Sequence, residues 1–304
     1  MVTASNRLRR ARPGLGTFVE IEASGRGHAE VGRAIDAAFD AVATVHRLMS
    51  FHDPDSDVSR LNREAFDRPV EVHAWTFQVL ERSVALHRQS KGIFDIAVAP
   101  ALQRMGLLPL FDQSAPIDRG APVVDAVELL GGQRIRFRHR RTRIDLGGIA
   151  KGFAIDRALE ALCSVDALDR GLVNAGGDLA AFGTEVQSVH IRHPRDPART
   201  VCRIDVAGEA LASTARRFDP FRSAETSTSA IIGPGGKTPA NAIDGVTVRA
   251  PSCMIADALT KVVMISGTDA APLLELHDAS ALLITADGSV QISPGWQHAV
   301  HLAA

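Results

Sequence analysis

Ile144-Asp145-Leu146-Gly147-Gly148-Ile149-Ala150-Lys151-Gly152-Phe153 is the stretch around which the chain is organised. It predicts an apolar strand end that delivers Asp145, a sharp turn at two glycines, and a helix with Lys151 in its first turn. Glycines let backbone approach a ligand closely, and free N–H groups at a helix start favour anions. The helix continues with a core-facing stripe at helical spacing, formed by Ile155, Ala158, Leu159 and Leu162. Taken alone, the segment fits an ordinary strand–turn–helix corner as well as a ligand site.

The composition excludes several classes of protein. In 304 residues, 34 Lys and Arg stand against 35 Asp and Glu, so no global field points to nucleic acid or an anionic membrane. The chain has no Tyr and two Trp, which argues against platforms for base stacking. Cys163, Cys202 and Cys253 are far apart and odd in number. They fit a reducing compartment and argue against a disulfide framework or a cysteine zinc site.

The first 13 residues carry four arginines but no apolar segment after them. They resemble neither a signal peptide nor a lipid-attachment sequence, and no run approaches about 18 apolar residues. We therefore expect a cytoplasmic protein with no membrane insertion. Residues 1–13 are expected to form a flexible basic N-terminus, and residues 14–304 one domain.

The order of predicted elements indicates an α+β fold with antiparallel sheets flanked by helices. Residues 16–22 alternate like a strand, and apolar residues from Ala29 onward recur at helical steps. A second helix is predicted over 75–89, and a strand interrupted by two glycines over 171–180. The final unit combines a strand at 245–249, helices at 255–266 and 272–277, and a closing hairpin at 281–292. The sequence has neither a Rossmann glycine pattern nor a Walker loop.

One predicted helix near the C-terminus gathers polar groups on a single face. Asp257, Thr260 and Lys261 stand at i, i+3 and i+4, so their side chains project together. A carboxylate and a hydroxyl beside carbonyls of a glycine turn are hard oxygen ligands that suit Mg²⁺. A helix-surface ion pair between Asp257 and Lys261 is the more ordinary explanation of this spacing.

Taken together, these segments resemble the FAD:protein FMN transferase family, the ApbE-like flavin transferases. The resemblance covers nearly the whole chain, in order. It is carried by Gly16-Thr17-Phe18, Met49-Ser50-Phe51, Ser59-Arg60-Leu61-Asn62, Gly92-Ile93-Phe94-Asp95, Asp145-Leu146-Gly147-Gly148-Ile149-Ala150-Lys151-Gly152, Leu172-Val173-Asn174-Ala175-Gly176-Gly177-Asp178 and Ala256-Asp257-Ala258-Leu259. The central stretch and the Asn-Ala-Gly-Gly-Asp strand together are specific.

The resemblance implies an enzyme that binds FAD and Mg²⁺, splits the pyrophosphate and joins FMN to a Thr or Ser hydroxyl of an acceptor protein, releasing AMP. It implies two related halves with the flavin site between them. By motif, the flavin or adenine pocket would be lined by Phe51, Ile93, Phe94 and Asp95, and cofactor polar groups would be held by Asp145 and Lys151. The metal would be held by the Gly148 carbonyl, Asp257 and Thr260, and the catalytic residues would be Asp257 and Lys261.

The chain departs from the family pattern in three segments. Ala230 and Gly233 stand where a histidine and an aspartate are usual, and Lys261 stands where a second hydroxyl often contacts the metal. Residues 212–215 read Ala-Ser-Thr-Ala instead of the usual Ala-Thr-Ser-Gly. Two other functions therefore remain open: an FAD-binding protein with reduced catalysis, and an FAD pyrophosphatase that yields FMN and AMP.

Overall fold

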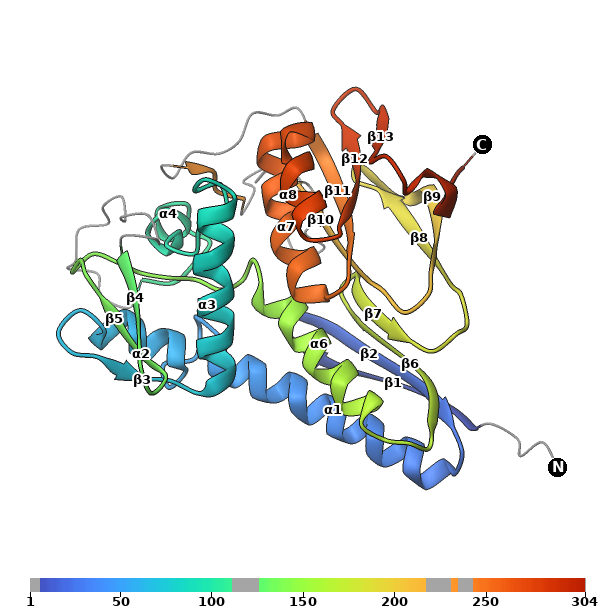
Figure 1. The fold of residues 1–304 in the computed structure, drawn as a ribbon, viewed down its shortest axis with the longest axis horizontal. Helices are drawn as coiled ribbons and strands as arrows, with labels where there is room; N and C mark the ends of the chain where they lie inside the picture. The colour runs from blue at the N-terminus through green and yellow to red at the C-terminus, as the bar shows by residue number, and fades with distance from the viewer. Residues whose placement is uncertain (1–5, 111–125, 217–230, 235–242, 304) are drawn as a thin grey trace.

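The centre of the molecule is an eight-stranded sheet (Figure 1), seen in a computed structural model that describes residues 6–110, 126–216, 231–234 and 243–303. All of its neighbouring strands are antiparallel, in the order β1-β2-β6-β7-β10-β11-β12-β13. The strands are β1 (Asn6–Gly14), β2 (Thr17–Gly25), β6 (Leu168–Ala175), β7 (Asp178–Phe182), β10 (Ala210–Ala215), β11 (Ile243–Ala250), β12 (Ser280–Thr285) and β13 (Val290–Ile292).

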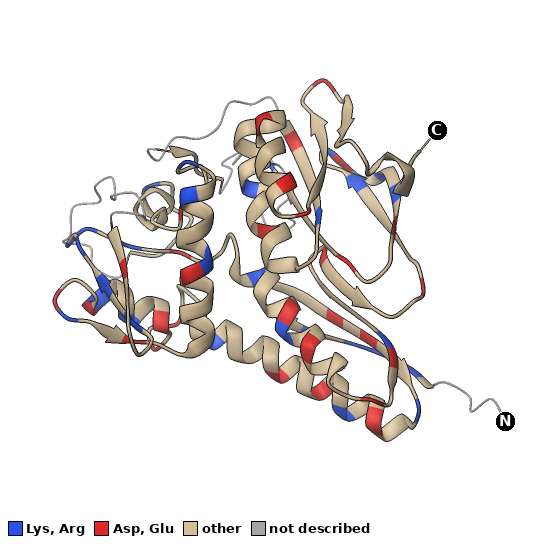
Figure 2. Ribbon diagram, viewed as in Figure 1, with Lys and Arg blue, Asp and Glu red and all other residues tan. Residues whose placement is uncertain are grey.

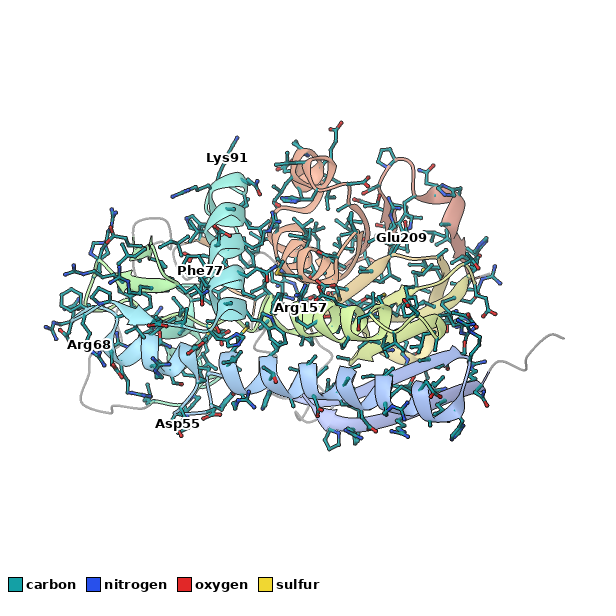
Figure 3. The ribbon with its side chains drawn as sticks, turned by 60° about the horizontal axis from the view of Figure 1, so that its bottom comes forward. Asp55, Arg68, Phe77, Lys91, Arg157 and Glu209 are labelled. Atoms are coloured by element: carbon teal, nitrogen blue, oxygen red, sulfur yellow. The ribbon has the colours of Figure 1, made fainter. Side chains whose placement is uncertain are left out.

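Three helices cover one face of this sheet: α1 (His28–Met49), α6 (Ala150–Cys163) and α7 (Cys253–Ser266). Helix α6 lies between α1 and α7, as Figure 3 shows with Arg157 labelled on α6. Each helix turns an apolar face inward, as Ile35 on α1, Ile155 on α6 and Leu259 on α7 are fully buried. The chain from α7 to β12 passes through η2 (Gly267–Ala270) and α8 (Ala271–Leu276).

A three-stranded sheet packs on the opposite face. It consists of β8 (Gln187–His193), β9 (Asp196–Val206) and β14 (Val300–Leu302), with η3 (Gln297–Ala299) leading into β14. Its Ile204 and the neighbouring Trp296 form one apolar cluster with Leu179, Leu211 and Leu282 of the large sheet. The molecule is therefore a helix layer, a large sheet and a small sheet, in that order.

A smaller lobe lies beside the C-terminal end of α1 (Figure 1). It contains α2 (Asp57–Glu64), α3 (Ala74–Gln89), α4 (Ala99–Arg104) and the sheet β3-β5-β4. Its strands are β3 (Val70–Glu71), β4 (Val127–Leu130) and β5 (Arg134–Phe137). The arginines of β5 alternate with buried Ile135 and Phe137, so they form the solvated face of this small sheet.

The architecture confirms the predicted α+β class with antiparallel sheets flanked by helices. Basic and acidic residues are interspersed over these elements (Figure 2), in agreement with the balanced composition. Over the described residues, every helix is too short or too polar to cross a membrane.

The prediction of a flexible N-terminus over residues 1–13 is wrong from residue 6 onward. Asn6–Gly14 is β1, an edge strand paired along its length with β2. Its arginines find acidic partners on neighbouring elements: Arg10 and Arg12 both contact Asp36 of α1, at 2.9 and 2.6 Å. Arg12 also lies 4.3 Å from the ring centre of Phe39. The charges therefore fasten the edge strand to α1 and do not mark a free tail.

Two local predictions also need correction. Residues 144–146 belong to none of the described strands, and their amides bond elsewhere. The Ile144 amide donates to Asn62 Oδ1 at 2.8 Å, and the Asp145 amide to the Ile96 carbonyl at 2.9 Å. The double glycine at 176–177 does not interrupt one strand but forms the turn between β6 and β7. Both glycines have positive φ, which suits a tight hairpin turn.

Candidate functional site

The site is built where the N-termini of α6 and α7 cross. Asp257, one turn into α7, is fully buried, and its Oδ2 accepts a hydrogen bond from the Gly152 amide of α6 at 3.0 Å. A Cβ placed on Gly152 would lie 2.2 Å from the Cys253 carbonyl oxygen and 2.8 Å from Asp257 Cβ. Glycine at this position therefore allows the two helices to approach closely enough for the bond.

A second aspartate connects the same helices in the opposite direction. Asp156 of α6 accepts hydrogen bonds from the amides of Cys253 and Met254 at 2.7 and 2.8 Å, in the first turn of α7. These amides have no partner within their own helix, so Asp156 and the Ser252 hydroxyl together cap α7. Burial raises the pKa of Asp156 to about 6, against the hydrogen bonds from the two amides, which lower it.

Lys151 and Asp178 form the first ion pair of the site. Lys151 Nζ contacts Asp178 Oδ2, and Asp178 Oδ1 accepts the Ser213 amide of β10 at 2.9 Å. The carboxylate is fully buried, whereas the lysine side chain is 26% exposed. Burial alone would lower the pKa of Lys151, but Asp178 and Asp257 outweigh it and raise the pKa above its ordinary value. Lys151 is therefore a permanent positive charge at the start of α6.

Lys261 and Asp257 form the second ion pair, within α7. Lys261 Nζ contacts Asp257 Oδ1 and lies 3.4 Å from Thr214 Oγ1 of β10. Burial would raise the pKa of Asp257, but Lys261 and Lys151 outweigh it and lower the pKa below its ordinary range. Asp257 is therefore a charged group whose two oxygens already have partners, Lys261 on one and Gly152 on the other.

The hydroxyl groups beside this pair form a chain with a defined donor order. The Thr260 hydroxyl donates to the Asp257 carbonyl at 2.7 Å, so it can only accept in its 2.7 Å contact with Thr214. Thr214 accepts in turn from Lys261. The chain of hydrogen bonds therefore begins at the Lys261 ammonium and ends on α7 backbone.

The residues predicted to line the flavin pocket lie along the central stretch. The bond from the Asp145 amide to the Ile96 carbonyl brings the turn with Phe94 and Asp95 against it. A Cβ on Gly148 would lie 3.9 Å from Phe94 Cε2 and 3.6 Å from Lys261 Cε, so Gly148 connects this turn with the ion pairs.

Exposure divides the predicted pocket residues into two groups. Phe51 and Phe94 are core residues, each 3% exposed, whereas Ile93, Asp95 and Asp145 are half-buried. Asp95 Oδ1 accepts the Ala97 amide at 2.8 Å. Burial raises the pKa of Asp145, against a 3.0 Å hydrogen bond from the Gly147 amide and the nearby His52. That these residues bind flavin or adenine stays a prediction.

Sequence reasoning missed Asp178, Asp156 and Thr214 as members of the site. Asp178 is the last residue of the Asn-Ala-Gly-Gly-Asp segment. Its carboxylate directly follows a glycine turn, and this position could have marked it as a site residue. Asp156 is a polar residue between buried Ile155 and Ala158 on a predicted helix, which also marked it. Ala230 lies outside the described residues.

An open hollow of about 440 Å³ adjoins α6 and shares Asp156 with the site, but neither Lys151 nor Lys261 lines it. Its lining includes Phe153, Asp156 and Arg157, which share a helix face opposite Lys151. It contains none of the predicted site residues.

The arrangement places two ammonium groups, each anchored by a buried carboxylate, beside a glycine turn. Both lysine side chains keep some exposure, 26% for Lys151 and 22% for Lys261. Such fixed positive charge suits a ligand with a polyanionic group such as a pyrophosphate. In the part of the chain that the structure describes, there is no group of three or more His, Cys, Asp or Glu residues that could hold a metal ion.

Comparison with known proteins assigns the chain to a family. The sequence model of the ApbE family matches residues 15–283, so the chain belongs to the ApbE family. Among curated proteins, it is 26% identical over 316 residues to the FAD:protein FMN transferase of Treponema pallidum, covering 94% of this chain and 86% of that protein. The FAD:protein FMN transferase of Vibrio cholerae is 27% identical over 237 residues, covering 74% and 71%.

Solved structures share the fold. The ApbE protein of Thermotoga maritima superposes with a TM-score of 0.85 at 23% identity, over 97% of this chain and 99% of that one. The flavin transferase ApbE of Vibrio cholerae superposes with a TM-score of 0.80 at 22% identity, with the same coverage.

Proposed function

We propose that this protein transfers FMN from FAD to a Thr or Ser hydroxyl of an acceptor protein and releases AMP. The observation that carries the proposal is the pair of lysines, Lys151 and Lys261, held by buried carboxylates at the crossing of α6 and α7. The relatives with the name FAD:protein FMN transferase support the choice of substrates.

The proposed reaction breaks the phosphoanhydride bond of FAD and forms one phosphoester bond to the acceptor. The acceptor hydroxyl oxygen attacks the phosphorus on the FMN side, and the bond from that phosphorus to the bridging oxygen breaks. AMP departs with the bridging oxygen, and the hydroxyl proton is released to solvent. Negative charge grows on the bridging oxygen as the bond breaks, so fixed cations beside the pyrophosphate stabilise the transition state. In this proposal, Lys151 and Lys261 are those cations.

Binding of the flavin half is assigned to the segments that meet the central stretch. In this proposal, Ile93 and Asp95 contact the flavin or adenine, because they are half-buried and lie in the turn tied to Asp145. Phe51 and Phe94 support that turn from the core. Asp145 accepts hydrogen bonds from the ligand when it is ionised and donates one when it is protonated.

The donor atoms expected to bind Mg²⁺ are already engaged in other contacts. Of the expected ligands, both Asp257 oxygens have partners, and the Thr260 hydroxyl is committed to the Asp257 carbonyl and to Thr214. The stem of Lys261 lies against Gly148, whose carbonyl was the third expected ligand. We therefore assign no step of the reaction to a metal ion.

The proposal is tested by incubating the purified protein with FAD and candidate acceptor proteins. Mass spectrometry of the acceptor should find a Thr or Ser peptide heavier by one FMN phosphoester. Free AMP should appear in equal amount, measured by separating FAD, FMN and AMP. FMN and AMP without a modified acceptor would show a pyrophosphatase, and intact FAD with an unmodified acceptor would contradict transfer.

One observation favours a second function, the binding of FAD with reduced catalysis. Ala230 stands where the family pattern has a histidine linked to transfer. A stoichiometric complex with FAD that stays intact through long incubation would support this second function. Restoring the residue by Ala230→His separates the two: a gain of transfer identifies position 230 as the missing group.

A further inference from the structure

We propose that the Lys261 ammonium takes the place of a divalent cation in this chain, so that the site carries its own cation and excludes Mg²⁺ and Mn²⁺. The exclusion is argued from geometry alone. The consequence that catalysis needs no metal rests on the proposed function.

The first argument is positional. Lys261 Nζ contacts Asp257 Oδ1 and lies 3.4 Å from Thr214 Oγ1, whose hydroxyl is 2.7 Å from Thr260 Oγ1. The ammonium thus lies among the hard oxygens that would otherwise surround a small cation. Mg²⁺ needs its oxygens at about 2.0–2.1 Å in an octahedral arrangement. An ammonium and a divalent ion cannot share Asp257 Oδ1 at these distances without strong repulsion.

The second argument is charge balance. Asp178 and Asp257 supply two negative charges, and Lys151 and Lys261 supply two positive charges. These two ion pairs together are therefore neutral as they stand. A divalent ion added here would leave an excess of two positive charges beside fully buried carboxylates. Replacing Lys261 by a neutral residue leaves one net negative charge, which favours a cation.

The third argument separates this contact from an ordinary helix ion pair. An exposed i, i+4 pair contributes little and changes partners easily. Here Asp257 is fully buried and bonded to the Gly152 amide, so the carboxylate cannot turn away from Lys261. The lysine stem runs over Gly148, with its Cε and Cγ at 3.6 and 3.8 Å from the position of a Cβ there. The Lys261 side chain is therefore held at its ammonium group by Asp257 and along its stem by Gly148.

Metal binding by the purified 304-residue chain tests the proposal without FAD. Mn²⁺ is titrated into the protein, and electron paramagnetic resonance distinguishes the bound ion from the free ion. The wild type should show no saturable site. Lys261→Thr adds an oxygen donor and removes the charge, so it should gain one Mn²⁺ site that Mg²⁺ displaces. Lys261→Met, the matched control, removes the charge without adding a donor and should bind more weakly than Lys261→Thr.

A saturable Mn²⁺ site in the wild type, as tight as in Lys261→Thr, would overturn the proposal. If a variant fails to fold, the titration of the wild type alone still tests whether the site excludes the metal ion. FAD cleavage or transfer by the wild type should keep its rate in excess chelator, and a loss of that rate would also overturn it. If the wild type acts on no FAD at all, the proposed function fails, while the Mn²⁺ titration still decides whether Lys261 excludes the metal.

Discussion

Asp257 of α7 caps the amide of Gly152 on α6. In the other direction, Asp156 of α6 caps the first two amides of α7. Each helix thus supplies the anion that the other helix start needs. This reciprocal capping fixes the crossing on which both lysines of the site are mounted.

Asp257→Ala should lower the free energy of unfolding by about 1–3 kcal/mol, because it removes the buried carboxylate that partners the Gly152 amide and the Lys261 ammonium. Flavin transfer should be lost with it. Urea unfolding measures the first effect and acceptor mass spectrometry the second. Asp269→Ala, on the exposed surface just beyond α7, should change stability by less than about 0.5 kcal/mol. Equal effects of the two variants would contradict the buried role of Asp257.

Gly152→Ala should force the two helices apart, because the added Cβ would meet the Cys253 carbonyl oxygen at 2.2 Å. We expect a loss of stability of about 1–3 kcal/mol or more, measured by thermal and urea unfolding. The matched control is Gly148→Ala in the same stretch, where the nearest atom to the added Cβ is 3.6 Å away. The crossing would be looser than described if both substitutions were tolerated alike.

The stability of the wild type relative to Asp156→Asn should depend on pH. The folded pKa of Asp156, about 6, lies above the ordinary value of 3.8, so the folded protein holds the proton more tightly than the unfolded chain. Protonated Asp156 therefore stabilises the folded protein fully below about pH 4, and this stabilisation is lost as the pH rises to about 6. The free energy of unfolding changes by about 3 kcal/mol over this range.

This pH effect is measured as the difference between the two proteins in urea unfolding, from pH 4 to pH 7. Most other titrating groups cancel in that difference. A wild type that gains stability over Asp156→Asn as the pH rises would contradict the raised pKa.

Lys151→Met should weaken FAD binding on the order of tenfold or more, because a charged hydrogen-bond donor to the pyrophosphate is lost. Quenching of flavin fluorescence on titration measures the affinity. Arg136→Met on β5 removes an exposed positive charge from the small lobe and should leave the affinity unchanged. If both variants bind FAD like the wild type, Lys151 does not contact the pyrophosphate.

Long periodic segments were predictable from the sequence, and short polar ones were not. The apolar stripes of α1 and α6 gave their helices directly, since burial of one face sets the period. Strand β1 was missed because its arginines look like a solvated tail until Glu20, Glu22 and Asp36 are in place. Helix α2 was missed because it is short and polar, with a start fixed by the Ser56 cap.

The candidate site was visible from the sequence only in part. Asp257, Thr260 and Lys261 share one helix face by spacing, so their proximity was predictable. The contact of Lys151 with Asp178 depends on the β6–β7 turn, and that of Gly152 with Asp257 joins residues 105 positions apart. No local pattern encodes such contacts, because they arise when two helices settle on one sheet.

The crossing of α6 and α7 has a consequence for how this chain can change during evolution. Its geometry is held by backbone amides and by Gly152, none of which depends on the residue at position 261. Substitutions there can exchange a side-chain charge for an ion-binding oxygen while the framework around them stays as it is. Related proteins can therefore differ in their need for an inorganic ion without differing in shape.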